Sequence, residues 1–561
     1  MNPSEGLQIG NSKEQTRPVN LSVESGIEPQ ICYDGFMKKE EAMKKKMTRK
    51  MAAALAGMTL LSAVSVCGST VAMADEASDP VEITIAIWNA DEAFSAGDEV
   101  LTTIEEKLGI KITPVNLTWD DYTQKVQLWA SSGSLPDVFV GDIRNSVTYS
   151  QWADQGVIHA IPDDLSAYPA LEAYLSGNAA QEAKLGGTLY CIPRQTYASQ
   201  EWTATDRIIS YRWDLAQKAG ITEEPTTWEE FSDMILAIIE ADPDGTGITG
   251  VTSDGNQLLG GMIMPYVSSI IEDNGSAFKW IETEDGTYKP AYFTEDVVAG
   301  FRLARDLYDS GVIDADVALA TTQSAKEKFL QGKSAAIFNA GGYGNMYSTV
   351  ALYWEDIHGT SYTDDVKAFV LPEDMNGNPS YPVWNYAWSE SFISSTVDDV
   401  KLDKILSLYD YLISDEGAFF GTYGPEGENY SFDENGKVVL NKEYSEIVAQ
   451  YPSLNAFMIL VRWNPSNYDD RFVADVPEEY VAVNKAIAEK AATVEIPAYS
   501  VECTQAVMSL EIEFTVNFNE DFLYIMTGTD PVEDMWAELL AQYEADGLNE
   551  MIEQVNAEVG K

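Results

Sequence analysis

The chain has 561 residues and a formal net charge of −55, with 90 Asp and Glu against 35 Lys and Arg. Such a surface repels phosphate, which excludes nucleic-acid binding because that role needs a basic footprint. Hydrophobic residues make up 45% of the chain and aromatic residues 11%, so the chain can bury a large core and is not a disordered polyanion. Its length exceeds what one hydrophobic core serves and predicts two lobes or more.

The N-terminal segment has the order of a secretory signal. A basic stretch at 44–50 precedes an apolar run at 51–66, which is shorter than the roughly 20 residues that span a bilayer. Met43 and Met37 are alternative starts of translation to Met1. We therefore expect residues 1–74 to be an upstream extension and signal peptide.

Two processing routes fit this segment. The small residues at 72–74 predict cleavage after Ala74. The alternative is lipid attachment at Cys67, although Val66 stands where a lipoprotein site prefers a small residue. Either route predicts a secreted, extracytoplasmic protein, tethered to the cell surface if Cys67 is lipidated.

Strand and helix patterns alternate after the signal. Alternating or continuous apolar residues predict strands over 81–88, 110–117 and 135–140, and apolar residues at helical spacing predict helices over 96–108 and 120–131 between them. This order predicts a parallel sheet, in which ligands bind beyond the carboxyl ends of the strands. Four residues at those ends are candidate ligand-binding residues by position: Trp88, Asn89, Asp91 and Asp142.

A second αβ region follows. Thr226 or Thr227 can cap a helix that starts at Trp228, and we interpret Trp228 as structural. Further elements are predicted at 297–309, 325–331, 334–339 (a strand), 402–413, 480–492 and 532–558, so that helix dominates the C-terminal region. Cys191 and Cys503 are the cysteines beyond the signal; two buried thiols are favoured over one disulfide.

Seven short segments, in order, carry a family resemblance. They are WASSGSLPDVF at 129–139, GTLYCIPR at 187–194, PTTWEEF at 225–231, DPDGTG at 242–247, EKFLQGKSA at 327–335, YGPEG at 423–427 and MTGT at 526–529. Together they resemble family 1 of the bacterial extracellular solute-binding proteins, in the large carbohydrate-associated group. The resemblance extends over nearly the whole chain after the signal.

The resemblance implies an α/β fold of two lobes, a clamshell of the periplasmic-binding-protein-like class II. Its lobes close on a ligand and then dock on a membrane permease. The chain of such a protein crosses the hinge three times, here expected near 196–206, 382–392 and 424–430. We therefore expect an N-lobe of residues 75–200 plus 390–425 and a C-lobe of residues 201–389 plus 426–561.

Aromatic rings and planar polar groups suit a sugar, because rings cover its C–H faces and polar groups bond its hydroxyls. The densest aromatic cluster lies at 381–390, where Trp384, Trp388 and Glu390 are candidates; the alternative is that two of its aromatic residues are core. Arg194, Glu201 and Trp202 are candidates at the first crossing, Tyr343 after a glycine pair, and Trp463 after Arg462. For Arg194 an inter-lobe salt bridge is the alternative.

The segment at 242–247 resembles a calcium loop. Asp242, Asp244 and Thr246 offer oxygen ligands at alternate positions. Loops that bind calcium continue with acidic residues, whereas this one continues with Gly250 and Val251. An Asp-rich turn is therefore the favoured interpretation, and calcium the alternative to a chain without a cofactor.

These observations favour a receptor of an ABC importer that captures an oligosaccharide and delivers it to permease subunits, acting as a monomer. The chain lacks the GxSxG, HExxH and Walker A motifs. The alternatives are a secreted glycan-degrading hydrolase and a ligand-binding sensor subunit.

Overall fold

The computed structural model describes residues 79–561 except 119–120, 145, 254–258, 272–278, 340–345, 348, 435, 464–468, 470, 473–476 and 513. The expected signal, Cys67 and the candidate Tyr343 lie outside the described residues. Within the described part of the chain, no helix combines the length and apolar character that crossing a membrane requires.

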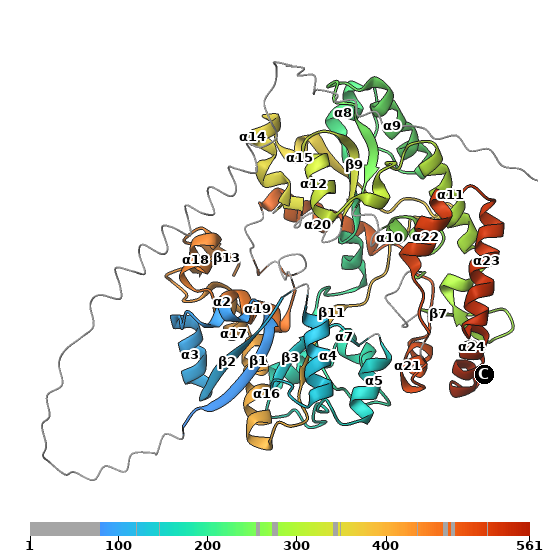
Figure 1. Ribbon diagram of the computed structural model, residues 1–561. Coiled ribbons are helices and arrows are strands. Elements are labelled where there is room, and N and C mark those ends of the chain that lie inside the picture. Colours follow the sequence, from blue (N-terminus) through green and yellow to red (C-terminus); the bar gives the residue numbers. More distant parts are fainter. Residues whose placement is uncertain are drawn as a thin grey trace, which may run out of the picture. The chain divides into compact units, whose positions relative to one another are not determined.

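A five-stranded sheet organises the first lobe (Figure 1). Its order is β2 (Ile110–Leu117), β1 (Val81–Trp88), β3 (Val138–Gly141), β11 (Ala387–Ile393) and β4 (Ile192–Gln195). β1 pairs in parallel with β2 and β3, as the βαβ pattern predicts. β11 inserts antiparallel between β3 and β4, so a distant stretch of chain completes the sheet.

Helices bury the apolar faces of this sheet. Their bounds are α2 (Ala90–Phe94), α3 (Glu99–Leu108), α4 (Tyr122–Ser132), α5 (Val147–Asp154), α6 (Pro169–Leu175), α7 (Asn178–Glu182), α16 (Asp399–Ile413), α17 (Asp415–Tyr423), α18 (Tyr444–Gln450) and α19 (Leu454–Val461). Ile85 and Phe139 of the sheet and Ile405 of α16 are fully buried in one hydrophobic cluster. Burial of this kind stabilises the fold by about 25 cal/mol per Å² of apolar surface.

A four-stranded sheet organises the second lobe. Its order is β10 (Val366–Phe369), β5 (Ile208–Arg212), β9 (Ser334–Asn339) and β6 (Thr249–Thr252). Around it lie α8 (Trp213–Lys218), α9 (Trp228–Ala241), α10 (Leu259–Ile263), α11 (Val297–Asp309), α12 (Thr322–Leu330), α14 (Trp354–His358), α15 (Tyr362–Asp365) and α20 (Glu478–Ala491). α9 begins as predicted, with Thr227 and Glu230 in a reciprocal capping box and Trp228 buried against Phe231 and Phe369.

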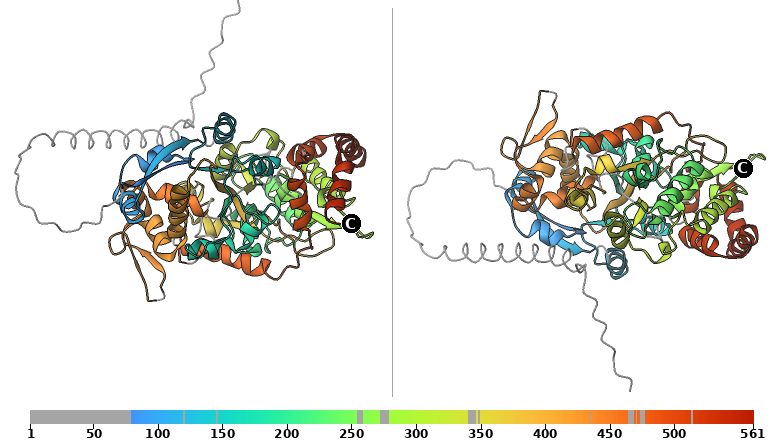
Figure 2. Two further views of the ribbon diagram at one scale, coloured as in Figure 1. Left: turned by 90° about the horizontal axis from the view of Figure 1, so that it is seen from below. Right: turned by 90° about the horizontal axis from the view of Figure 1, so that it is seen from above.

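The C-terminal region is helical, as expected (Figure 2). It contains α21 (Val501–Ser509), α22 (Phe518–Thr527), α23 (Val532–Ala545) and α24 (Leu548–Glu558), and a hairpin of β7 (Trp280–Glu282) and β8 (Tyr288–Pro290) packs with them. The helix predicted over 532–558 is two helices, because Gly547 takes a left-handed conformation with φ 111° between them. Cys191 and Cys503 are both buried and free, which confirms the favoured interpretation.

The chain passes between the two lobes three times. The first passage runs from β4 to β5, and the second runs from β10 to β11, so that β11 already occupies much of the range 382–392 expected for the second. The third differs. Ile447, Leu454 and Phe457 of α18 and α19 are buried in the cluster of the first lobe. Phe472 still packs on Phe419 of α17, so the third connection begins near Phe472. α18 and α19 therefore pack in the first lobe, whereas the sequence placed the residues after 425 in the second lobe. The remaining lobe boundaries stay a prediction.

Candidate ligand-binding site

Three indole rings meet at the carboxyl end of β1. Trp88 and Trp388 stack, with ring centroids 5.8 Å apart and an interplanar angle of 13°. Trp463 meets Trp388 edge to face at 5.3 Å and Trp88 at 6.5 Å. We call Trp88, Trp388 and Trp463 the tryptophan platform. Within the platform the ring of Trp88 is buried, whereas Trp388 and Trp463 keep part of their surface exposed.

Backbone pairing brings these residues together from distant parts of the chain. Trp88 is the last residue of β1, where a ligand site is expected in a parallel sheet. Trp388 lies near the start of β11, and its backbone N–H donates to the Thr196 hydroxyl at 2.9 Å. Trp463 donates its backbone N–H to the Gln195 carbonyl at 2.9 Å, which holds it beside β4. The platform therefore combines a residue from β1, early in the chain, with residues from β11 and from position 463, much later in the chain.

Asp142 supplies the accessible polar group of the platform. It follows β3, its carboxylate accepts the indole N–H of Trp388, and the residue is exposed. Desolvation by the surrounding protein raises the pKa of the Asp142 carboxyl, and the nearby Arg144 and Arg194 partly offset this rise.

Glu390 and Arg144 form a buried ion pair behind the platform. Arg144 Nε lies 3.1 Å from Glu390 Oε1, and its Nη2 donates to the Ala387 carbonyl at 3.2 Å. Burial raises the pKa of the Glu390 carboxyl to about 7, and Asp142 adds to this rise while the two arginines oppose it. Because Glu390 is 1% exposed, its carboxylate is not accessible from the surface.

Arg194 is the second buried cation. It is 0% exposed, donates through Nη1 to the Ser389 hydroxyl, and has its Cζ 5.2 Å from the centre of the Trp88 ring. Its Nε and Nη2 find no hydrogen-bond partner among the described residues. Burial lowers the pKa of Arg194 to about 10. All of these contacts lie within the first lobe. They therefore do not form the inter-lobe salt bridge that the sequence left open as an alternative.

The remaining described candidates lie at the start of α2, in a short helix after β4, and just before β11. Asn89 and Asp91 are exposed at the start of α2. Glu201 and Trp202 are half-buried in the short helix η1 (Gln200–Thr205), where Glu201 accepts from the Ser199 hydroxyl at 2.5 Å. Trp384 is 7% exposed, which matches the alternative that it belongs to the protein interior.

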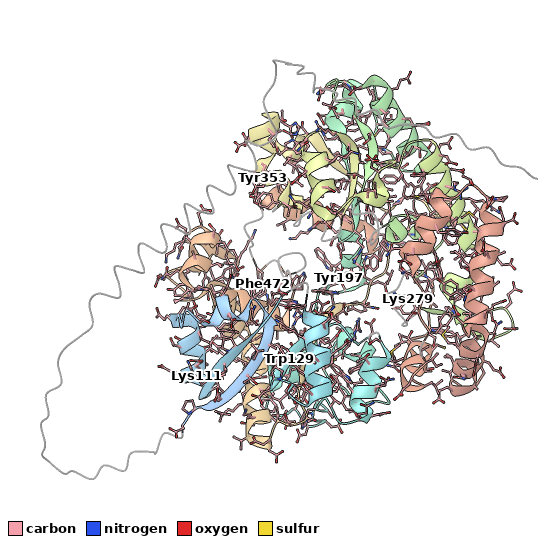
Figure 3. All side chains as sticks on the ribbon, in the orientation of Figure 1. Lys111, Trp129, Tyr197, Lys279, Tyr353 and Phe472 are labelled. Carbon is pink, nitrogen blue, oxygen red and sulfur yellow. The ribbon has the colours of Figure 1, made fainter. Side chains whose placement is uncertain are left out.

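Trp384 lies on the second inter-lobe connection and contacts Arg207 on the first. The guanidinium of Arg207 lies 4.0 Å from the centre of the Trp384 ring. Arg207 Nη1 also donates to the Asp206 carboxylate at 2.9 Å, and the Tyr197 hydroxyl donates to the same carboxylate. Figure 3 labels Tyr197 on the first connection and Phe472 on the third. The ring of Trp384 is thus packed between two connections, with little of its surface exposed.

Two contributors to the site were missed. Tyr122, half-buried at the start of α4, packs edge to face on Trp88 at 5.4 Å. In the sequence it is one of the residues at helical spacing within 120–131, which indicates a helix and not a ligand site. Arg144 follows β3 by three residues and gave no signal, because its partner Glu390 lies on another strand.

The Asp-rich loop does not fit a calcium ion. The Asp242 carboxylate accepts the backbone N–H groups of Thr246 and Gly247, at 3.0 and 3.1 Å. Lys218 Nζ lies 2.9 Å from Asp244 Oδ1 and so provides the cation itself. A side chain at Gly250 would place its Cβ 2.1 Å from the Val312 carbonyl oxygen, which excludes an acidic ligand there. Within the described residues no three acidic, His or Cys side chains are grouped to hold a metal.

The sequence model of the bacterial extracellular solute-binding proteins matches residues 89–419. The chain belongs to this family. The match covers more than half of the chain and includes Trp88's neighbour Asn89, Asp142 and the whole of β11.

Individual relatives are distant. The chain is 23% identical over 434 residues to the lipoprotein LipO of Bacillus subtilis, covering 75% of this chain and 81% of the relative. It is 24% identical over 341 residues to the polygalacturonan/rhamnogalacturonan-binding protein YtcQ of the same organism, covering 59% and 64%. The S. pneumoniae ABC-transporter substrate-binding protein FusA, solved in complex with kestose, matches with a TM-score of 0.61 at 16% identity, covering 85% and 98%. These structural likenesses establish the two-lobe α/β fold.

Proposed function

We propose that the chain is the extracellular substrate-binding receptor of an ABC importer and captures an oligosaccharide between its lobes. The tryptophan platform carries this proposal. Partly exposed indole rings beside an accessible carboxylate match the C–H faces and hydroxyls of a sugar. The platform lies at the carboxyl ends of strands and beside the connections to the second lobe, where closure can enclose a ligand.

Delivery to a membrane permease is part of the proposal. Relatives named as ABC-transporter substrate-binding proteins and as a lipoprotein support it. A receptor of this kind works as a monomer outside the membrane, either released after residue 74 or held through a lipid on Cys67. Ligand binding stabilises the closed state, which the permease then recognises.

The rival function is glycan hydrolysis, for which a pair of accessible carboxyl groups is needed. Asp142 is accessible, but Glu390 is 1% exposed and paired with Arg144. This pair therefore suits binding and not general acid–base chemistry. A sensor subunit would bind a ligand in the same way and differs only in its partner.

The test is to incubate the purified protein with a panel of oligosaccharides and follow thermal unfolding and the fate of each sugar. We expect a saturable rise in Tm with at least one oligosaccharide, which is recovered intact. Shortened products in the supernatant would reject the receptor and favour the hydrolase.

A further inference from the structure

The polar chemistry that the platform offers to a ligand is acidic. The Asp142 carboxylate is exposed and already holds the Trp388 indole N–H. Behind it, the Glu390 carboxylate is buried, and its Oε2 has no hydrogen-bond partner among the described residues. Of the two, Asp142 is the one that presents its negative charge directly to a sugar stacked on Trp388, because Glu390 is buried and paired with Arg144.

The two cations beside these carboxylates are withdrawn from a ligand. Arg194 is 0% exposed and lies over Trp88, and Arg144 is 5% exposed and engaged by Glu390 and the Ala387 carbonyl. Every Lys and Arg after residue 78 lies in the part of the chain that the structure describes, because the undescribed segments there contain neither. Those segments therefore add no further cation to the platform.

Arg144 and Arg194 compensate part of the negative charge of Asp142 and Glu390 from within the protein. Because both arginines are buried, neither can bind the carboxylate of a uronic acid bidentately, and that carboxylate would face the exposed Asp142. A neutral sugar can instead donate a hydroxyl to Asp142, a hydrogen bond to a charged acceptor. Family membership leaves this choice open, because one relative is named for polygalacturonan binding and another was solved with kestose.

We infer that the sugar unit seated on the tryptophan platform is uncharged, so the receptor selects neutral oligosaccharides over their uronate counterparts. The inference rests on the proposed function. Asp142 is the residue that determines this selectivity, and Arg194 acts as a buried structural cation.

The test compares sugars that differ only in charge. Trigalacturonate and its carboxyl-reduced form are one such pair, and similar pairs with glucose and mannose backbones extend the panel. Titration calorimetry is carried out at about pH 8 so that the carboxyl groups are ionised. This pH is above the pKa of Glu390, which burial raises to about 7. We expect the neutral member of a bound pair to bind at least about tenfold more tightly.

Matched variants assign the effect to its residue. Asp142→Asn removes the charge at nearly constant size and should reduce the neutral preference at least about threefold. Glu553→Gln removes one charge from the exposed surface of α24 and should leave the preference unchanged. If Asp142→Asn does not fold, raising the salt concentration with wild type provides the second measurement, because screening should narrow the preference.

The outcomes separate the inference from the proposed function. Equal or tighter binding of the uronate member overturns the inference and leaves the receptor function standing. A neutral preference that Asp142→Asn leaves intact also overturns it, because the charge then acts elsewhere. Absence of binding to every member of the panel overturns the proposed function and the inference together.

Discussion

Trp88 and Trp388 stack at 5.8 Å with their rings 13° from parallel, although one ends β1 and the other begins β11. The two rings can meet because β11 pairs with β3, and β3 in turn pairs with β1. Trp463 joins through its backbone bond to Gln195 of β4. The platform is therefore a product of sheet order, and each of its rings can be tested separately.

Trp388→Ala should weaken oligosaccharide binding and leave the fold intact. The ring is partly exposed, so its loss removes a stacking surface worth about 1 kcal/mol, which is roughly fivefold in Kd. The loss is smaller if Trp463 compensates. Titration calorimetry gives the Kd, and thermal unfolding without ligand serves as the control. Unchanged affinity in the folded variant would exclude Trp388 from the site.

Trp384→Ala should show the opposite pattern. Because Trp384 is 7% exposed and covered by Arg207, its removal leaves a cavity that costs about 3 kcal/mol of unfolding free energy. Denaturant unfolding measures this loss. A stable Trp384→Ala protein with strongly weakened binding would show that Trp384 contacts the ligand, as the sequence first suggested.

Glu390 should make stability depend on pH. Burial raises the pKa of its carboxyl from 4.5 to about 7 in the folded state. The folded protein therefore binds the proton more tightly than the unfolded chain. The resulting stability, up to about 3 kcal/mol, is present below pH 4.5 and is lost as pH rises to about 7.

Glu390→Gln isolates this contribution, because all other carboxyl groups titrate in both proteins. The stability of wild type relative to Glu390→Gln should fall between about pH 4.5 and 7 in denaturant unfolding. A difference that stays constant with pH would show that Glu390 titrates normally.

Calcium and chelators should leave the melting temperature unchanged. Lys218 occupies the place of a cation at Asp244, and Gly250 leaves no room for an acidic ligand. Lys218→Met should cost at most about 1 kcal/mol, because the ion pair is exposed. Restoration of stability by added calcium in either protein would contradict this account.

Local patterns predicted much of the fold. The strands over 81–88, 110–117 and 334–339 and the helix over 297–309 match the structure, because alternation and helical spacing report which face of an element is buried. The third passage between the lobes was not predicted, since the apolar residues of α18 and α19 could be buried by either lobe. Their true partner was decided by long-range packing around Phe457.

Part of the candidate site could also be predicted from the sequence. Trp88 and Asp142 follow from the rule that ligands bind at the carboxyl ends of parallel strands. Trp388 and Glu390 were found through aromatic density, whereas the role of Tyr122 and Arg144 required knowing that β11 lies beside β3. Trp384 and Trp388 are four residues apart, and sequence alone could not tell the buried ring from the exposed one.

Capture of an oligosaccharide is tested most directly by incubating wild type and Trp388→Ala with a panel of free glycans and identifying the retained sugars by mass spectrometry. We expect wild type to retain intact neutral oligosaccharides and Trp388→Ala to retain less of them while remaining folded. Retention of no sugar by wild type, or recovery of cleaved sugars, would contradict the proposed function.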